Sequence, residues 1–143
     1  MEKVYSGTIE GNLPRKSNGR RITRSGMVIK SKKALDYEKS FSLQVKKGET
    51  IEGDLALLAV VYYDSRRPDL SDELLSDCLE KSGVIENDRQ IKVKMLDRRL
   101  DKVKPRVEFE LWSLPKYQEN ETNGGGLLRR MGEALKTIYV EEI

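Results

Sequence analysis

PDLSDELLSDCLEKSGVIENDRQI, from Pro68 to Ile91, is the stretch that decides the fold. Its apolar side chains recur at the spacing of one helix face, at Leu70, Leu74, Leu75, Cys78 and Leu79. Ser71 is the expected N-cap, and Gly83 lies where a helix of this length would stop. The stretch therefore predicts a short amphipathic helix whose apolar face packs into a core.

The same stretch is rich in carboxylates. Asp69, Glu73 and Asp77 follow one another at intervals of four residues, so they share one flank of the predicted helix. Asp88 opens the next segment, DRQIKVKM, which alternates like a strand. Acidic residues at the start of a helix are commonly solvated charges that favour the helix dipole. The alternative is that an aspartate before the helix meets Asp88 at the start of the next strand, at one edge of a sheet. With Asp72 also in this stretch, that would make a carboxylate cluster of the kind that holds Mg²⁺ or Mn²⁺.

Strand patterns surround this helix. Leu55–Tyr63 (LALLAVVYY) is a continuous apolar run, which predicts a central strand buried on both faces. Alternating apolar residues predict half-buried strands that begin at Ile91 and near Val107, and a short strand is expected over 4–10. Strands and helices in this order predict an α/β fold, a single domain with a small mixed sheet and helices packed on it.

The remaining segments carry helix and loop signals. Ser31 is a predicted N-cap for a helix that runs to Gly48, and residues 11–26 read as a loop followed by a brief extended piece at 27–29. The polar, glycine-rich residues 115–126 predict a linker between a main domain, 1–114, and a C-terminal tail, 127–143. The tail should begin with an amphipathic helix over 127–136 that docks on the body or on a partner.

Composition limits the chemistry. The chain has 143 residues, of which 36% are charged, and it contains no histidine. The absence of histidine excludes Ser-His-Asp and Cys-His nucleophiles and nearly every catalytic zinc site. Cys78 is the only cysteine, so an internal disulfide is excluded and a cytoplasmic location is expected. We expect neither a signal peptide nor a membrane span, because no apolar run approaches about 20 residues.

Positive charge is concentrated near the N-terminus. No acidic residue lies between Glu10 and Asp36. The basic residues of that interval are Arg15, Lys16, Arg20, Arg21, Arg24, Lys30, Lys32 and Lys33. Such a stretch is typical of a surface that binds the phosphates of nucleic acid, although a solvated charged face is the alternative.

Taken in order, several blocks resemble the RusA-type Holliday-junction resolvases, a family of small endonucleases. The blocks are IEGNLPRKSN, IKSKKALDYEKSF, the apolar strand, RRPDL and DCLEKSGVIENDRQI, and the resemblance extends from Val4 to Trp112. Family members carry DLDN, a lysine on the following helix, and DALxxxGVxxDD. Their Mg²⁺ is held by both aspartates of DLD and by the second aspartate before the final strand, a position that Asp88 matches.

This sequence departs from the family pattern at the first motif. If Asp69 is aligned with the first aspartate of DLD, Ser71 takes the place of the second and Asp72 that of the asparagine. If the helix is aligned without a gap from Asp77, Asp69 becomes the second aspartate and Arg67 replaces the first. In that alignment Glu73 stands where the family has its catalytic lysine. Either Asp72 or Glu73 would then supply charge to a metal.

The resemblance implies a Mg²⁺-dependent endonuclease that cuts four-way DNA junctions as a homodimer. Asp69 and Asp88 would be metal ligands, completed by Asp72 or Glu73, and Arg66, Arg67 or Lys81 would replace the missing lysine. The basic stretch would hold the DNA backbone. The alternatives are a junction-binding protein with this fold and no metal chemistry, and, with less support from aromatic residues, an RNA-binding module.

Overall fold

A mixed four-stranded sheet forms the centre of the molecule. The computed structural model describes residues 1–14, 20–122 and 124–140. The strands lie in the order β1 (Lys3–Glu10), β6 (Arg106–Ser113), β4 (Leu55–Tyr63) and β5 (Ile91–Leu100). β4 pairs with β5 in parallel, whereas the β1–β6 and β4–β6 pairs are antiparallel. The α/β fold with a small mixed sheet, predicted from the sequence, is confirmed.

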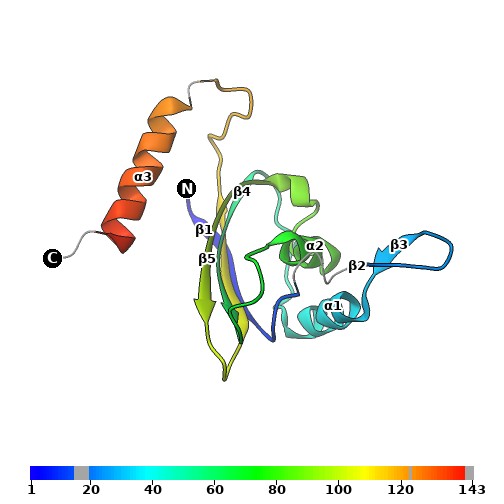
Figure 1. Ribbon diagram of the computed structural model, residues 1–143. Helices are drawn as coiled ribbons and strands as arrows, with labels where there is room; N and C mark the ends of the chain where they lie inside the picture. Colours follow the sequence, from blue (N-terminus) through cyan, green and yellow to red (C-terminus); the bar gives the residue numbers. More distant parts are fainter. Residues whose placement is uncertain (15–19, 123, 141–143) are drawn as a thin grey trace.

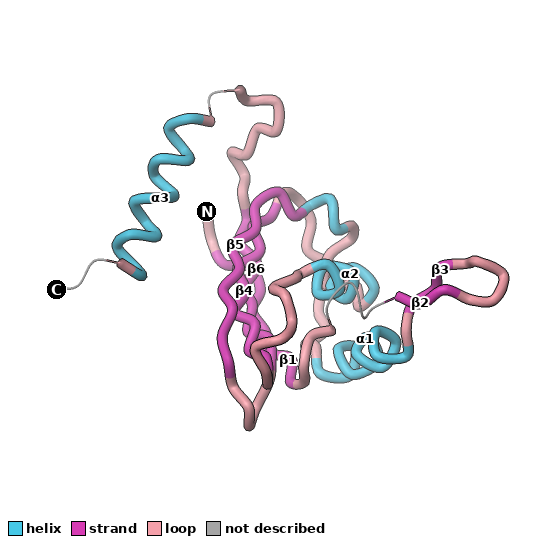
Figure 2. Tube along the Cα trace, in the orientation of Figure 1, coloured by secondary structure: helices cyan, strands magenta, loops and turns pink. Residues whose placement is uncertain are grey.

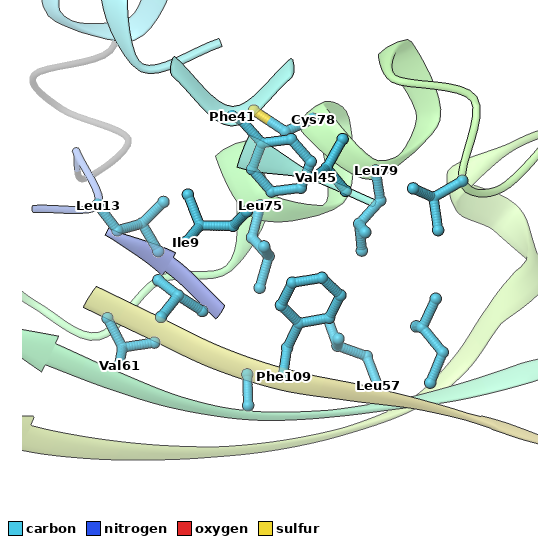
Figure 3. Close-up of a cluster of buried hydrophobic side chains, with 14 of the residues drawn as sticks. Ile9, Leu13, Phe41, Val45, Leu57, Val61, Leu75, Cys78, Leu79 and Phe109 are labelled. Atoms are coloured by element: carbon cyan, nitrogen blue, oxygen red, sulfur yellow. The ribbon is translucent and has the colours of Figure 1, made fainter. Parts of the chain in front are cut away.

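Two helices cover one face of this sheet, here called the front face (Figure 1). α1 (Lys32–Gln44) and α2 (Glu73–Lys81) pack on it and enclose the core shown in Figure 3. Apolar side chains from both helices meet residues of β1, β4 and β6, among them Ile9, Phe41, Leu57, Val61, Leu75, Leu79 and Phe109. The front face therefore provides most of the apolar burial that stabilises the fold.

The ends of the two helices differ in part from the predictions. Ser31 caps α1 as expected, because its side chain accepts a hydrogen bond from the Ala34 amide. α1 ends at Gln44, however, four residues before the predicted stop at Gly48. Gly83, with φ of +81°, follows α2 as predicted. The prediction of Ser71 as the N-cap of α2 is wrong, because Asp72 holds that position without a side-chain capping bond.

The opposite, back face of the sheet is less covered. Leu58, Val60 and Tyr62 of β4 point to this side and are half-buried. The prediction that this strand is buried on both faces is therefore only partly right, since helices pack closely on one face alone. α3 (Gly125–Tyr139) stands beside the back face (Figures 1 and 2). No helix in the described part of the chain combines the length and apolarity that a bilayer crossing needs.

A small hairpin projects from the helical side. β2 (Arg20–Ile22) and β3 (Val28–Lys30) pair antiparallel and form a separate two-stranded sheet. The hairpin extends beyond α1 and α2, away from the main sheet (Figure 2). The hairpin leads directly into α1, so its base lies beside the two helices.

Candidate functional site

The core side of α2 fixes the direction of its acidic flank. Leu75, Cys78 and Leu79 are fully buried against the sheet, which leaves Glu73 and Asp77 on the neighbouring, half-buried side. Burial raises the pKa of the Asp77 carboxyl, and the nearby Asp88 and Glu73 carboxylates raise it further, while Lys30 and Lys81 oppose the rise. Glu73 and Asp88 therefore each lie within electrostatic reach of Asp77, and we call the three residues the acidic cluster.

Asp88 reaches the cluster from the short 3₁₀ helix η2 (Asp88–Gln90), which follows α2. The Asp88 amide donates to the Glu80 side chain at 2.9 Å, which ties η2 to the last turn of α2. Asn87 caps η2 with its side chain, and Gln90 completes a capping box. These local bonds place Asp88 next to the last turn of α2.

Gln90 holds η2 against the sheet. Its side-chain NH₂ donates to the carbonyls of Ile51 and Gly53, each at 3.0 Å. Its side-chain oxygen accepts from the amides of Glu86 and Asn87 at 2.8 and 2.9 Å. One side chain thus satisfies four backbone groups where β4 and β5 begin.

An acid–base bridge between partly buried and exposed side chains joins the cluster to the hairpin. Glu38 of α1 accepts hydrogen bonds from Lys30, at the end of β3, and from Lys81 at 3.2 Å. Burial alone would raise the pKa of Glu38, but the two lysines outweigh it and hold the pKa below its usual value. Lys30 and Lys81 are therefore both bound to Glu38 at a point close to Asp77 of the acidic cluster.

The other predicted metal ligands, Asp69 and Asp72, make contacts outside the acidic cluster. Asp72 pairs with Lys94 of β5 at 2.8 Å and accepts from the Ser76 hydroxyl at 3.2 Å. Asp69 lies in the loop before α2, where its carbonyl accepts a hydrogen bond from the Tyr63 hydroxyl. These contacts of Asp69 and Asp72 involve neither Asp77 nor Asp88.

The loop before α2 is also fixed by arginine. Arg98 donates to the carbonyl of Arg66 and lies over the Tyr63 ring, 5.7 Å from its centroid. Arg66 and Arg67 are exposed at this point. Arg67, predicted as a catalytic cation, thus lies in the same loop as Asp69.

The predicted DNA-binding residues fall into three groups. Arg21, Arg24, Lys32 and Lys33 are exposed on the hairpin and the first turn of α1. Lys30 is half-buried and bound to Glu38, so its contacts are with carboxylates of this chain. Arg15 and Lys16 lie outside the described residues, and Arg20 is described only as a backbone position of β2.

The donor chemistry of the acidic cluster suits a hard divalent cation, because all its ligands would be carboxylate oxygens. Among the described residues, no three His, Cys, Asp or Glu side chains gather as a ready-made metal cage. Mg²⁺ is commonly held by one or two carboxylates together with substrate phosphates. A pair drawn from the cluster fits that mode of binding, whereas a cage formed by the protein alone does not.

Sequence reasoning placed Asp77 on the acidic flank but left open whether it joins the site, and it did not identify Glu38. The spacing of Glu73 and Asp77 was the available signal for the first. Glu38 had none, because its partners come from β3 and α2, which only the tertiary fold brings together.

The chain matches no protein-family model, and a comparison with curated proteins also finds no match. The likeness to the RusA-type resolvases therefore rests on the sequence blocks alone and stays a prediction.

Proposed function

We propose that this protein is a divalent-metal-dependent DNA endonuclease that cuts four-way junctions. The observation that carries the proposal is the position of the acidic cluster at the base of the basic hairpin. Exposed cations on the hairpin and the start of α1 suit the phosphates of DNA, and the carboxylates beside them suit a metal. The RusA-like blocks of the sequence support the same function.

In this proposal Asp77 and Asp88 hold the cation, with Glu73 beside them and the scissile phosphate supplying further oxygens. A bound Mg²⁺ or Mn²⁺ would supply an activated water for attack on phosphorus and charge stabilisation for the leaving oxygen. Asp69 and Asp72, the other predicted ligands, are the rival pair at the start of α2. Breaking the Asp72–Lys94 contact would be required before Asp72 took part.

The lysines have a separate role. Lys81 is exposed on α2 next to Asp77, where it can pair with negative charge that develops on the phosphoryl oxygens. Lys30 is held by Glu38 and its pKa is raised, although burial opposes the rise, so it stays protonated at neutral pH. Together they would take the place of the family lysine, whose position is held by Glu73 in the ungapped alignment. Arg67 is the rival cation, in the loop that contains Asp69.

Two symmetric nicks resolve a junction, so the proposed enzyme acts as a homodimer with one site in each copy. The second candidate function is junction binding without chemistry. The pairing of Asp72 with Lys94 and of Glu38 with two lysines favours it, because these carboxylates are already neutralised without a metal.

Cleavage of a labelled four-way junction, with Mg²⁺ and with a chelator, separates the two functions. We expect metal-dependent cleavage by the wild type and its loss in Asp88→Asn and Asp77→Asn, with junction affinity kept. Glu49→Gln, which neutralises an exposed acid after α1, is the matched control and should cut like the wild type. Loss in Asp69→Asn and Asp72→Asn, with full activity in Asp77→Asn, would move the site to the rival pair.

The DNA-binding surface is tested by salt dependence. Replacing Arg21 and Arg24 with alanine should reduce the slope of log K against log salt by about 2, because two phosphate contacts are lost. The double replacement of the exposed Lys46 and Lys47, beyond the end of α1, removes the same charge and should leave the slope unchanged. An equal effect of both variants would show that the hairpin has no special part in binding.

A further inference from the structure

A groove runs between the back face of the sheet and α3. Its volume is about 630 Å³, and its walls come from all four strands of the main sheet on one side and α3 on the other. The apolar part of the sheet wall includes Leu58, Val60 and Met95. The α3 wall consists of Leu135, Ile138 and Tyr139.

α3 is attached to the sheet near its C-terminal end. The Tyr139 hydroxyl donates to Asp97 of β5 at 2.9 Å, and the Arg99 guanidinium lies 5.8 Å from the centroid of the Tyr139 ring. These contacts hold α3 as a wall of the groove and leave the space between helix and sheet open.

α3 carries an apolar stripe that the rest of its own chain leaves exposed. Leu128, Met131, Leu135 and Ile138 follow the alternating three- and four-residue spacing of a coiled-coil seam. Their side chains are 73%, 40%, 48% and 62% exposed. A helix of this length has marginal stability in water unless its apolar face is packed against another surface. We therefore expect the stripe to bind a partner surface.

The charges of the groove and of α3 are opposite. The groove wall includes Asp97, Glu108 and Glu110 and no cationic residue. α3 carries Arg129, Arg130 and Lys136 against one acid, Glu133. Cations at the rim already neutralise part of the wall: Arg99 pairs with Asp97, Arg106 with Glu108, and Lys3 with Glu110. The wall still suits a basic amphipathic helix better than an acidic one.

We propose that this groove takes α3 from a second copy of the chain, so that two α3 helices pair along their stripes in a two-fold dimer. The stripe is self-complementary, and the same operation places each helix against the partner's acidic back face. The protein's own α3 already forms a wall, so a second helix is needed to fill the space. The paired helices would form the interface of the homodimer in the proposed function, and their pairing does not depend on nuclease chemistry.

The oligomeric state of the full chain, measured by sedimentation or light scattering without DNA or metal, tests this proposal. At about 50 µM we expect a dimer of the 16.4-kDa chain, and Leu128→Lys should weaken the association at least tenfold, that is by about 1.4 kcal/mol or more. Leu128 lies outside the groove lining and is largely exposed, so this change should leave the monomer folded, as circular dichroism would show. Thr137→Lys adds the same charge on a neighbouring side of α3 and should still dimerise.

Cross-linking identifies the surface directly. Met131→Cys, near the middle of α3, should form a covalent dimer with a short bismaleimide, whereas Thr137→Cys should not. The native Cys78 is 2% exposed and so will not compete for the reagent. A monomeric wild type, an equally tight Leu128→Lys dimer, or equal cross-linking at both positions would overturn the proposal. The nuclease assays are independent of these results.

Discussion

The two faces of the sheet are built from the same strands but differ in how completely helices cover them. On the front face, Leu57, Val61 and Phe109 are sealed under α1 and α2. On the back face, Leu58 and Val60 alternate with them along β4 yet remain half-buried beside α3. Apolar burial, and with it stability, is therefore concentrated on the front face, which helices cover closely. The back face keeps partly exposed apolar side chains that a partner could bind.

The largest expected difference between the faces is in core stability. Phe109 stacks between Phe41 and Tyr5, with ring centroids 6.4 and 5.9 Å away. Phe109→Ala should lower the free energy of unfolding by about 3–5 kcal/mol, because it leaves a cavity in a packed core. Chemical denaturation measures this change. Leu58→Ala on the back face should cost less than half as much, and an equal cost would mean that the back face is sealed too.

A smaller effect is expected at the acid–base bridge. Glu38→Gln should destabilise the fold by about 1 kcal/mol at neutral pH, because it weakens the hydrogen bonds from Lys30 and Lys81. The folded pKa of Glu38 is below its ordinary value of 4.5, so its stabilisation is present above that pH and is lost as the pH falls through the folded pKa. Denaturation between pH 6 and 3 should therefore show a shallower loss of stability on acidification in the variant. Lys39→Met, on an exposed neighbouring position of α1, is a control that keeps the bridge.

The smallest effect has the opposite sign. The pKa of Asp77 is raised, so its charge destabilises the fold at neutral pH. Asp77→Asn should leave the free energy of unfolding unchanged or raise it by a few tenths of a kcal/mol, while removing the proposed metal-dependent cleavage. Thermal unfolding measured beside the cleavage assay checks both. A clear loss of stability would assign Asp77 a structural role in place of the proposed one.

The sequence predicted the front face of the sheet better than the back face. The stripe on α2 and the apolar run of β4 identified the elements, because periodicity reports which residues seek a core. The apolar run of β4 does not show whether the back face of that strand will be covered. The helix beside that face, α3, comes much later in the sequence, after the loop that follows β6. The β2–β3 hairpin was expected as loop followed by a brief extended piece, because three-residue strands rich in charge carry no alternation.

The start of α2 shows why the site was harder to predict than the fold. Ser71 has the right chemistry for a cap, but Asp72 takes the position and its carboxylate binds Lys94 from β5. A long-range ion pair thus replaces a local capping bond, and no local pattern contains that information. The same holds for Glu38, whose two lysines come from separate elements.

The four hydrogen bonds of Gln90 have a consequence for motion. Glu86 and Asn87 lie on an exposed loop, where backbone amides normally exchange their protons with solvent quickly. Because both amides are bound to one side chain that is itself bonded to the loop before β4, we expect them to exchange only when this whole set of hydrogen bonds opens. Hydrogen exchange should therefore be slow at the amides of Glu86 and Asn87, next to Asp88. The backbone beside the proposed site would then stay ordered even while the surrounding surface moves.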